Sequence, residues 1–398
     1  MPNRSLSFAS LFSGCGGFDL GYLSRGFRAK GAFDIDQDAV ANYGANLGGP
    51  IALADLTTGI PNEHRIKQID ALIAGPPCQG FSTAGKREVN DHRNHLLTLT
   101  GKIALRLTPK VLVVENVAGA LSGEHAKYLR SLEMAMRAAG YRTHTLKCQV
   151  AELGTAQLRK RVLFFAWNTG LGIQFRQPRE EPRTLRMVLE GVETQHNHNP
   201  RRLVPHTRDW YIAKRIKAGQ KLSNVRGGDN SISTWQIPEV FGAITEDECT
   251  VLELLRRLRR QDRTRDFGDA DPVSYERLQN ALGRKFKRIV EGLIAKGYVR
   301  RIGGCVDLVG TFNGKYRRLA WEKPSCTVDT RFGEPRYFLH PSQLRGFTVR
   351  EAARIQAFPD SYVFQGNEQT QYRLIGNAVP PPLASYAAEI TLQLLGRA

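Results

Sequence analysis

The sequence predicts an α/β fold in which helices are doubly wound around a central sheet, with a second, smaller domain inserted. Short apolar runs bounded by glycine, proline or polar residues recur through the first 167 residues and are typical of buried strands. Segments with helical apolar periodicity lie between them, so strands and helices alternate. This alternation is lost after about residue 168 and returns near the C-terminus, which indicates the inserted domain.

The first strand is followed by a glycine turn and a helix. The run 5–12 is strand-like, and Ser13-Gly-Cys-Gly-Gly17 precedes the helical residues. Glycines let a ligand approach the backbone closely, but this spacing is not the dinucleotide fingerprint. The turn therefore favours a nucleoside-type cofactor, with Gly14, Cys15 and Gly16 as expected contacts.

Acidic residues end the next two strands. Asp34 ends the second run, where a carboxylate can accept both ribose hydroxyls. Asp36 is an alternative ribose contact, but we interpret it as the N-cap of the helix that begins at Gln37. Asp55 ends the third run and could accept the exocyclic amine of an adenine. These strand ends indicate an adenosine-containing ligand without a phosphate-cradling loop, and S-adenosyl-L-methionine fits better than a dinucleotide.

A proline-bounded cysteine follows the fourth apolar run. Residues 69–74 read as a buried strand, and Gly75-Pro-Pro-Cys-Gln-Gly-Phe-Ser82 follows it. The two prolines stop the strand because they offer no N–H and fix φ. Cys78 therefore lies on a rigid loop past the carboxyl end of a strand, where open α/β sheets bind ligands. A free cysteine is often a small core residue, but the polar neighbours favour a nucleophile.

Two further polar patterns point to the same edge of the sheet. The apolar run 109–117 closes on Glu115, and a carboxylate is costly to bury unless it has a partner or a role. Beside Cys78 it is a candidate for holding the edge of a base, with a helix cap or a structural ion pair as the alternative. In an extended segment, alternation puts Gln157, Arg159 and Arg161 on one face, with a solvated charge run as the alternative.

The composition indicates a polyanionic partner. Lysine and arginine number 57 against 38 aspartate and glutamate, for a formal net charge of +19. Nucleic acid is the first candidate, and a basic soluble surface is the alternative. We find no signal peptide and no apolar run near the roughly 18 residues of a membrane span, so we expect a cytoplasmic protein without a membrane partner. Six scattered cysteines indicate neither a disulfide framework nor a metal site.

Changes in pattern predict the domain boundaries. We expect residues 1–177 to form a catalytic domain, residues 178–320 a second domain, and residues 321–398 to return and complete the first. Within that return, Thr348 with Glu351 indicates a capping box, and Gly376-Asn377 indicates a turn that opens the last helix. Helices followed by a hairpin at about 246–310 indicate a winged-helix-like module. The last helix of this module has its apolar positions on one face and its cations largely outside it, and a solvated helix is the alternative to a DNA-binding one. Its candidate DNA contacts are Arg284, Lys285, Lys287 and Arg288.

With these pieces placed, the chain resembles a DNA (cytosine-5)-methyltransferase of the bacterial type. The matching stretches occur in the family's order and cover most of the chain outside about 178–320, which is where this family carries its variable target-recognition region. They are Phe12-Ser-Gly-Cys-Gly-Gly17, Gly75–Ser82, Glu115-Asn-Val117, Gln157-x-Arg159-x-Arg161, Arg350-Glu-Ala-Ala-Arg354 and Gly376-Asn-Ala-Val-Pro-Pro381.

The resemblance implies the fold, the reaction and the roles of the matching residues. The fold is a Rossmann-like methyltransferase sheet, and the reaction transfers a methyl group from S-adenosyl-L-methionine to a flipped-out cytosine in duplex DNA, without a metal. Cys78 attacks C6 of the cytosine and Glu115 binds its N3/N4 edge. Arg159 and Arg161 orient the base and its phosphate. The expected DNA contacts in these motifs are Gln79, Ser82 and Gln157.

The resemblance also implies the cofactor contacts. Phe12 stacks on the adenine, Asp34 holds the ribose and Asp55 binds the adenine amine. Asp34 stands where many relatives have glutamate, so the sequence departs from the family there. The remaining expected contacts are Ile35, Pro77, Asn377 and Val379.

Other readings stay open at this point. An RNA (tRNA) cytosine-5-methyltransferase is a close alternative, although that branch lacks a long recognition region. A winged-helix DNA-binding regulator would explain the charge but not Cys78 with Glu115. For the enzyme we expect a monomer that acts on DNA in the nucleoid, either with a separately acting restriction endonuclease or as an orphan epigenetic methylase.

Overall fold

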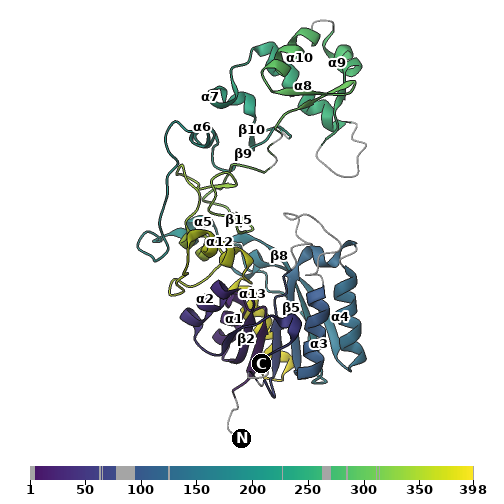
Figure 1. Cartoon of the computed structure of the whole chain (residues 1–398), viewed down its shortest axis with the longest axis vertical. Coiled ribbons are helices and arrows are strands. Elements are labelled where there is room, and N and C mark those ends of the chain that lie inside the picture. Colours follow the sequence, from purple (N-terminus) through teal and green to yellow (C-terminus); the bar gives the residue numbers. More distant parts are fainter. Residues whose placement is uncertain are drawn as a thin grey trace. The chain divides into compact units, whose positions relative to one another are not determined.

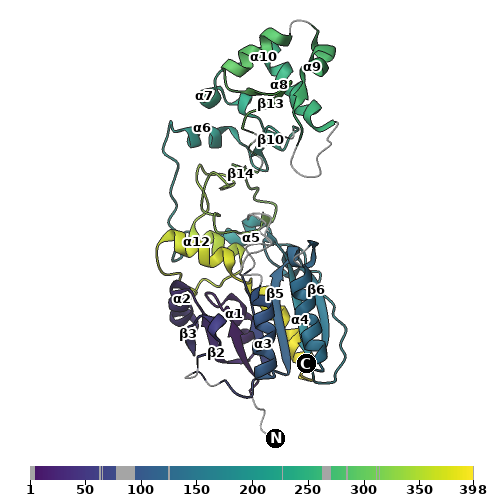
Figure 2. The same cartoon turned by 45° about the vertical axis from the view of Figure 1, so that its right-hand side comes forward.

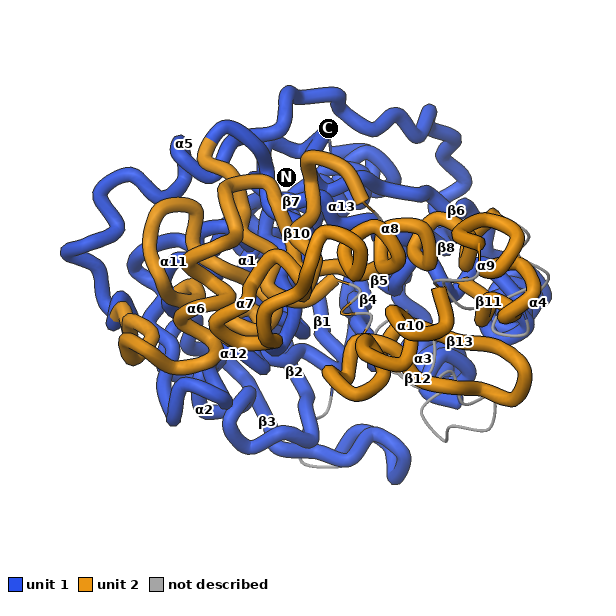
Figure 3. Tube along the Cα trace, turned by 90° about the horizontal axis from the view of Figure 1, so that it is seen from above, with its two compact units in different colours: residues 1–199, 322–331, 348–398 blue, residues 200–321, 332–347 orange. Residues whose placement is uncertain are grey.

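The computed structural model divides the chain into two compact units (Figure 3). Unit 1 contains residues 1–199, 322–331 and 348–398, and unit 2 contains residues 200–321 and 332–347. The residues that the structure describes are 5–61, 64, 66–77, 95–123, 126–225, 227–261, 270–283, 286–310, 312 and 314–397.

The unit boundaries differ from those expected at residues 177 and 320. Residues 178–199 stay with unit 1 because they bond to the C-terminal return: Leu185 N–H donates to the Lys323 carbonyl at 3.1 Å. Residues 332–347 join unit 2, where Tyr316 N–H donates to the Arg336 carbonyl at 2.7 Å. The chain therefore crosses between the units more often than the sequence pattern indicates.

Unit 1 is built on a seven-stranded sheet with the order β3-β2-β1-β4-β5-β8-β6. The first five strands in this order are parallel, and β8 is antiparallel to both β5 and β6. The doubly wound α/β fold is thereby confirmed. The strands are β1 (Ser7–Leu11), β2 (Arg28–Asp34), β3 (Ile51–Leu53), β4 (Ala71–Ala74), β5 (Val111–Val117), β6 (Arg142–Gln149) and β8 (Lys160–Trp167).

Helices cover both faces of this sheet because its strands are apolar on both sides (Figure 1). Phe8 and Val113 point into a core with helices α1 (Gly17–Ser24) and α13 (Pro381–Leu394). Leu11 and Val114, which lie an odd number of residues further along β1 and β5, point into the opposite core. That core is closed by α3 (Leu96–Leu107) and α4 (Ala126–Ala138), and α2 (Gln37–Leu47) packs beside β2 and β3.

The C-terminal segment returns to the start of the chain, as predicted. In Figure 2 the yellow α13 runs behind the sheet whose first elements are purple, and α1 and α13 approach so closely that a Cβ on Gly21 would lie 2.3 Å from Ser385 N. Helix α11 (Val349–Ile355) begins with the predicted capping box of Thr348 and Glu351. Gly376-Asn377 does not form the predicted turn, since both residues belong to α12 (Glu368–Asn377). A Cβ on Gly376 would lie 2.5 Å from the Asp329 carbonyl carbon, so close backbone contact explains this glycine.

Unit 2 contains the helices and hairpin predicted near its centre. Three strands form an antiparallel sheet with the order β11-β13-β12, and three helices pack on it around Leu255, Val290 and Val306. The element order is that of a winged helix. The elements are α8 (Glu246–Gln261), β11 (Val273–Ser274), α9 (Tyr275–Leu282), α10 (Phe286–Ala295), β12 (Val299–Ile302) and β13 (Cys305–Leu308).

The remaining elements are short. Across the parts of the chain that the structure describes, every helix is too short or too polar to cross a membrane. The short helices are α5 (Leu185–Leu189), α6 (Arg208–Arg215) and α7 (Pro238–Phe241). The short strands are β7 (Gln157–Leu158), β9 (Lys221–Leu222), β10 (Ser231–Ile232), β14 (Arg317–Arg318), β15 (Ser325–Cys326) and β16 (Phe338–Leu339).

Candidate active site

Strand topology brings most of the predicted site residues to one edge of the unit 1 sheet. Since β1, β2, β4 and β5 are parallel, the residues at their carboxyl ends line the same edge. Strand β8 runs the other way, so its first residues reach this edge too, and Arg161 pairs in register with Val117 of β5. Pro77 is the last described residue of the cysteine loop. Cys78, Gln79 and Ser82 lie outside the described residues.

An ion pair joins Glu115 to Arg161 at this edge. Arg161 Nε lies 2.8 Å from Glu115 Oε1, and each side chain is only 12% exposed. Arg161 also donates Nη1–H to the Lys160 carbonyl at 2.8 Å. Removing one partner of a buried pair leaves an uncompensated charge, which commonly costs about 3–5 kcal/mol. The pair therefore fixes a carboxylate and a guanidinium side by side where strand β5 ends.

Arg159 and Gln157 occupy buried positions that differ from those expected. Arg159 donates to the carbonyls of Val328, Gly376 and Ala378 at 2.9, 3.2 and 3.1 Å. Gln157 is fully buried and donates to the Gln356 side chain, so the expectation that it faces DNA is corrected. The segment divides into β7 and β8, and both side chains hold the returning C-terminal segments.

Asp34 organises the glycine turn. Its carboxylate accepts the Gly14 N–H at 2.7 Å and the Asp36 N–H at 2.9 Å, and burial raises its pKa. A carboxylate offers about four lone pairs, so acceptor capacity remains for a ligand hydroxyl. Asp36 caps α2 as predicted, accepting the Asp38 N–H at 3.0 Å. Arg373 of α12 binds the carboxylates of Asp36 and Asp38.

The surroundings of this turn fit a nucleoside. A Cβ added at Gly14 would meet no atom within 4 Å, whereas one at Gly16 would lie 2.4 Å from Leu47 Cδ1. Gly14 thus leaves open space, and Gly16 is needed for packing against α2. Ile35, next to Asp34, is 68% exposed and offers an apolar surface to a planar base. Phe12 adopts a positive φ of 54°, which directs the chain out of β1 into the turn.

The other predicted cofactor residues lie around the same strand ends or cap local structure. A Cβ on Gly75 would lie 3.7 Å from both the Phe12 carbonyl oxygen and Val379 Cγ2, so Val379 reaches the predicted position beside β1 and β4. Asn377 is exposed at the end of α12. Asp55 is exposed and accepts the Thr57 hydroxyl and N–H at 2.7 and 2.9 Å, which lowers its pKa.

The burial of two ionisable groups near the turn was not anticipated from the sequence. Asp19, in the first turn of α1, accepts the hydroxyls of Ser10 and Tyr43 at 2.8 and 2.9 Å, and burial raises its pKa to about 7. Burial also raises the pKa of the Cys15 thiol to about 12, so Cys15 is a thiol rather than a thiolate at neutral pH. A single carboxylate in a helical run carries no pattern that distinguishes burial from exposure.

The chain is similar to known methyltransferases in sequence and in fold. The profile of the family described as C-5 cytosine-specific DNA methylase matches residues 6–392. The type II methyltransferase M.AgeI of Thalassovita gelatinovora is 28% identical, with 95% of this chain and 97% of that protein aligned. M1.HphI of Haemophilus parahaemolyticus, also named a type II methyltransferase, is 28% identical over 98% of this chain and 87% of its own length. The Entamoeba histolytica methyltransferase EhMeth shares the fold, with a TM-score of 0.58, 14% identity and 99% of each chain covered.

We expect Asp19→Asn to change how the free energy of unfolding depends on pH. The folded protein keeps this carboxyl protonated up to about pH 7, whereas its ordinary pKa is 3.8. Its contribution to stability is therefore complete below pH 3.8 and is lost as pH rises through 7. In urea titrations, the stability of Asp19→Asn relative to wild type should rise between about pH 4 and about pH 7 and then stay level. A relative stability that does not change with pH would contradict a raised pKa at Asp19.

Proposed function

Because the chain belongs to the family of C-5 cytosine-specific DNA methylases, we propose that it methylates C5 of a cytosine extruded from a specific duplex DNA site. S-adenosyl-L-methionine is the proposed methyl donor, and Cys78 the proposed nucleophile. The observation that carries the proposal is the buried pair of Glu115 and Arg161 at the carboxyl edge of the sheet, 2.8 Å apart, next to the strand that leads into the cysteine loop. This edge is where α/β enzymes bind their substrates.

The chemistry requires a nucleophile because C5 of cytosine is too weakly nucleophilic to accept a methyl group directly. The Cys78 thiolate forms a bond to C6, which breaks the C5–C6 double bond and makes C5 enamine-like. C5 would then take the electrophilic methyl group of S-adenosyl-L-methionine, whose bond to the sulfonium sulfur breaks and leaves the neutral thioether S-adenosyl-L-homocysteine. The C5 proton leaves to a base, the double bond re-forms and the thiolate departs. Both faces of the ring must be reached, so the base must leave the stack, at a cost of a few kcal/mol.

Glu115 and Arg161 have complementary roles in this scheme. Glu115 holds the N3/N4 edge of the cytosine and favours the protonated, electron-poor ring, which promotes addition at C6. Arg161 fixes the Glu115 carboxylate by the ion pair and supplies positive charge for the base and its phosphate. Arg159 orients the base indirectly, because its donors hold the carbonyls of three C-terminal residues. Preorganised polar groups of this kind are commonly worth about 100–1,000-fold in rate.

The residues around the glycine turn would hold S-adenosyl-L-methionine. Gly14 leaves room for close approach, and Asp34 retains acceptor capacity for the ribose. Ile35 and Phe12 offer apolar surface to the adenine, and Asp55 offers an acceptor to its amine. We assign Cys15, Gly16, Pro77, Asn377 and Val379 to the same site from the family pattern.

The biological setting follows from the relatives, which are named type II methyltransferases. We propose that the protein protects DNA as the methylating partner of a restriction–modification system. It would act as a monomer in the cytoplasm, with the endonuclease acting separately.

We assign target recognition to unit 2, where helix α10 carries two exposed cations. Lys287 and Arg288 are exposed, and neither forms an ion pair with any described residue. Two other cations of the winged-helix-like module are paired with acids: Lys296 binds Glu248 at 2.7 Å, and Arg301 binds Glu291. The second helix of a helix-turn-helix is the element that enters the major groove. Arg284 and Lys285, the other two candidate contacts, lie outside the described residues.

The nucleophile assignment predicts a trapped adduct. Wild type should form a covalent adduct with duplex DNA that carries 5-fluorocytosine at the target, because the C5 fluorine cannot leave as a proton does. Cys78→Ala should form none and transfer no methyl group, whereas Cys305→Ala, which removes a half-exposed free thiol, should behave as wild type. Denaturing gels and methyl incorporation measure the two outcomes. An adduct in Cys78→Ala, or transfer to tRNA instead of duplex DNA, would refute the proposal.

The assignment of Glu115 to the N3/N4 edge of the cytosine predicts that Glu115→Gln lowers the methyl-transfer rate about 100–1,000-fold. Specific DNA binding should persist. Single-turnover rates and band-shift affinities report these two quantities separately. Glu389→Gln is the control, since it removes only an exposed ion pair with Arg25. If Glu115→Gln turned over normally and only lost thermal stability, Glu115 would be a structural residue.

The assignment of α10 predicts weaker and less salt-dependent DNA binding in the double variant Lys287→Ala/Arg288→Ala. Each phosphate contact contributes about 0.9 to the log–log salt slope, so the slope should fall by up to about 1.8. Lys102→Ala/Arg130→Ala removes the same charges from α3 and α4 and should leave affinity and slope unchanged. Fluorescence anisotropy at several salt concentrations measures both. Unchanged binding in the α10 variant would move target reading to residues 200–225.

A further inference from the structure

A buried tyrosine from the C-terminal return contacts the glycine turn directly. The Tyr362 hydroxyl donates to the Cys15 carbonyl at 2.5 Å, with the Asn42 carbonyl of α2 as a second acceptor at 3.3 Å. The Tyr362 side chain is almost completely buried and its ring packs against Phe358 and Phe364. Cys15 lies at the centre of the turn, between Gly14 and Gly16, so this one hydroxyl fixes the orientation of the peptide group that links Cys15 to Gly16.

Side-chain amides hold the backbone of the tyrosine segment in place. Asn46 of α2 accepts the Val363 N–H at 2.7 Å and donates to the Val363 carbonyl at 2.9 Å. Asn197 makes the same pair of bonds to Phe364, both at 2.9 Å. Residues 362–365 thus run as an extended segment whose polar backbone groups are satisfied by asparagines on both sides.

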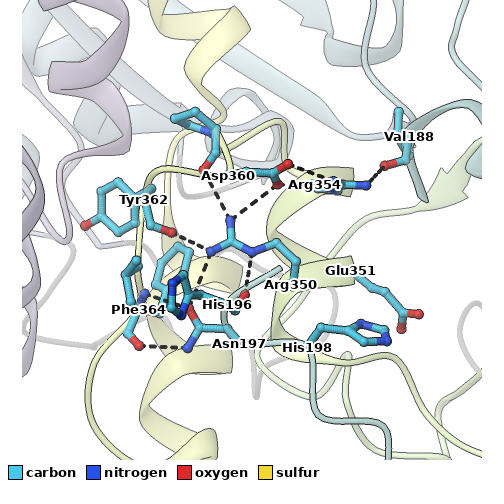
Figure 4. A network of polar contacts seen from close by, with 12 residues as sticks. Val188, His196, Asn197, His198, Arg350, Glu351, Arg354, Asp360, Tyr362 and Phe364 are labelled. Atoms are coloured by element: carbon cyan, nitrogen blue, oxygen red, sulfur yellow. Dashed lines mark hydrogen bonds and ion pairs between the residues drawn. The ribbon is translucent and has the colours of Figure 1, made fainter. Parts of the chain in front are cut away.

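Arg350 holds the carbonyl of the same tyrosine (Figure 4). The side chain is fully buried and donates to the Tyr362 carbonyl at 2.6 Å and to the His196 carbonyl at 2.8 Å. A third donor reaches the Pro359 carbonyl at 3.2 Å. A buried guanidinium is tolerated only when its donors have acceptors. Arg350 therefore also fixes the backbone carbonyl of Tyr362. Tyr362 is therefore held at its carbonyl, at its ring and at its hydroxyl.

We propose that Tyr362 is a positioning residue for the S-adenosyl-L-methionine turn. It acts by holding the Cys15 carbonyl so that the open side at Gly14 keeps the shape that the methyl donor requires. The inference rests on the proposed function for the identity of the ligand. The contact between Tyr362 and Cys15, which spans 347 positions in the sequence, stands independently of that assignment.

The expected size of the effect follows from the loss of one buried hydrogen bond. Tyr362→Phe keeps the ring but leaves the Cys15 and Asn42 carbonyls without the hydroxyl donor. A buried group that loses its hydrogen-bond partner destabilises the local structure, and part of this loss is recovered if the turn relaxes. Binding of S-adenosyl-L-methionine must restore the original turn, so its dissociation constant should rise about 5–20-fold. The KM for DNA and the bound-state rate should change little.

The experiment compares Tyr362→Phe with Tyr386→Phe. Tyr386 of α13 is also buried, and its hydroxyl donates to a backbone carbonyl, that of Arg176 at 3.0 Å, away from the turn. Both variants lose the same chemical group, so a general loss of stability should be similar in the two. Calorimetric titration with S-adenosyl-L-methionine should show weaker binding in Tyr362→Phe alone, with a raised KM for the methyl donor and an unchanged KM for DNA.

Hydrogen exchange gives a readout that needs no ligand. In the free protein, amides of residues 13–17 should exchange faster in Tyr362→Phe than in wild type or Tyr386→Phe. Equal exchange and equal affinity in all three proteins would overturn the proposal. If wild type failed to bind S-adenosyl-L-methionine while exchange at the turn still accelerated in Tyr362→Phe, the proposed function would fail and the positioning contact would stand.

Discussion

Buried arginines that donate to backbone carbonyls hold distant segments of this chain together. Arg159 links the edge of the catalytic sheet to Val328 and Gly376, Arg350 links His196 to Tyr362, and in unit 2 Arg318 donates to the carbonyls of Ala213 and His340. A buried cation needs all its donors satisfied, and carbonyls from separate segments can satisfy them only when those segments meet in one arrangement. These side chains therefore act as geometric constraints on where the interrupted catalytic unit closes, and the site at the sheet edge depends on that closure.

Local patterns predicted the elements of the fold, and contacts between distant segments account for what they missed. Apolar periodicity located β5 and α3, and side-chain chemistry located the caps at Asp36 and Thr348. The prediction of a turn at Gly376 was wrong. Glycine is required at this position because the Asp329 backbone leaves no room for a Cβ atom. Strict alternation placed Gln157, Arg159 and Arg161 on one face because it does not register the break between β7 and β8. The Tyr362 contact leaves no local signal, since its partner is 347 positions away.

The count of 57 lysine and arginine residues overstates the number of cations that are available to DNA. Several cations of the winged-helix-like module are engaged with acids: Arg259 and Arg300 both bind Asp307, at 2.5 and 3.2 Å. Such ion pairs fix the side chains, and the electric fields of the two opposite charges cancel at a distance. Composition therefore identifies the class of partner, while the distribution of ion pairs distinguishes which helix face retains charge for it.

The order of segments in unit 1 has a consequence for how the protein is made. Helix α1 buries its apolar face against α13, whose residues 381–394 are synthesised only after unit 2. At roughly 5–20 residues per second, translation of residues 168–380 takes about 10–40 s. During that interval the nascent sheet has one apolar face without its closing helix, while unit 2 emerges and can fold first. The newborn chain is thus exposed to aggregation for longer than a contiguous domain of the same size, and it is a natural client for chaperones that shield apolar surface on the ribosome.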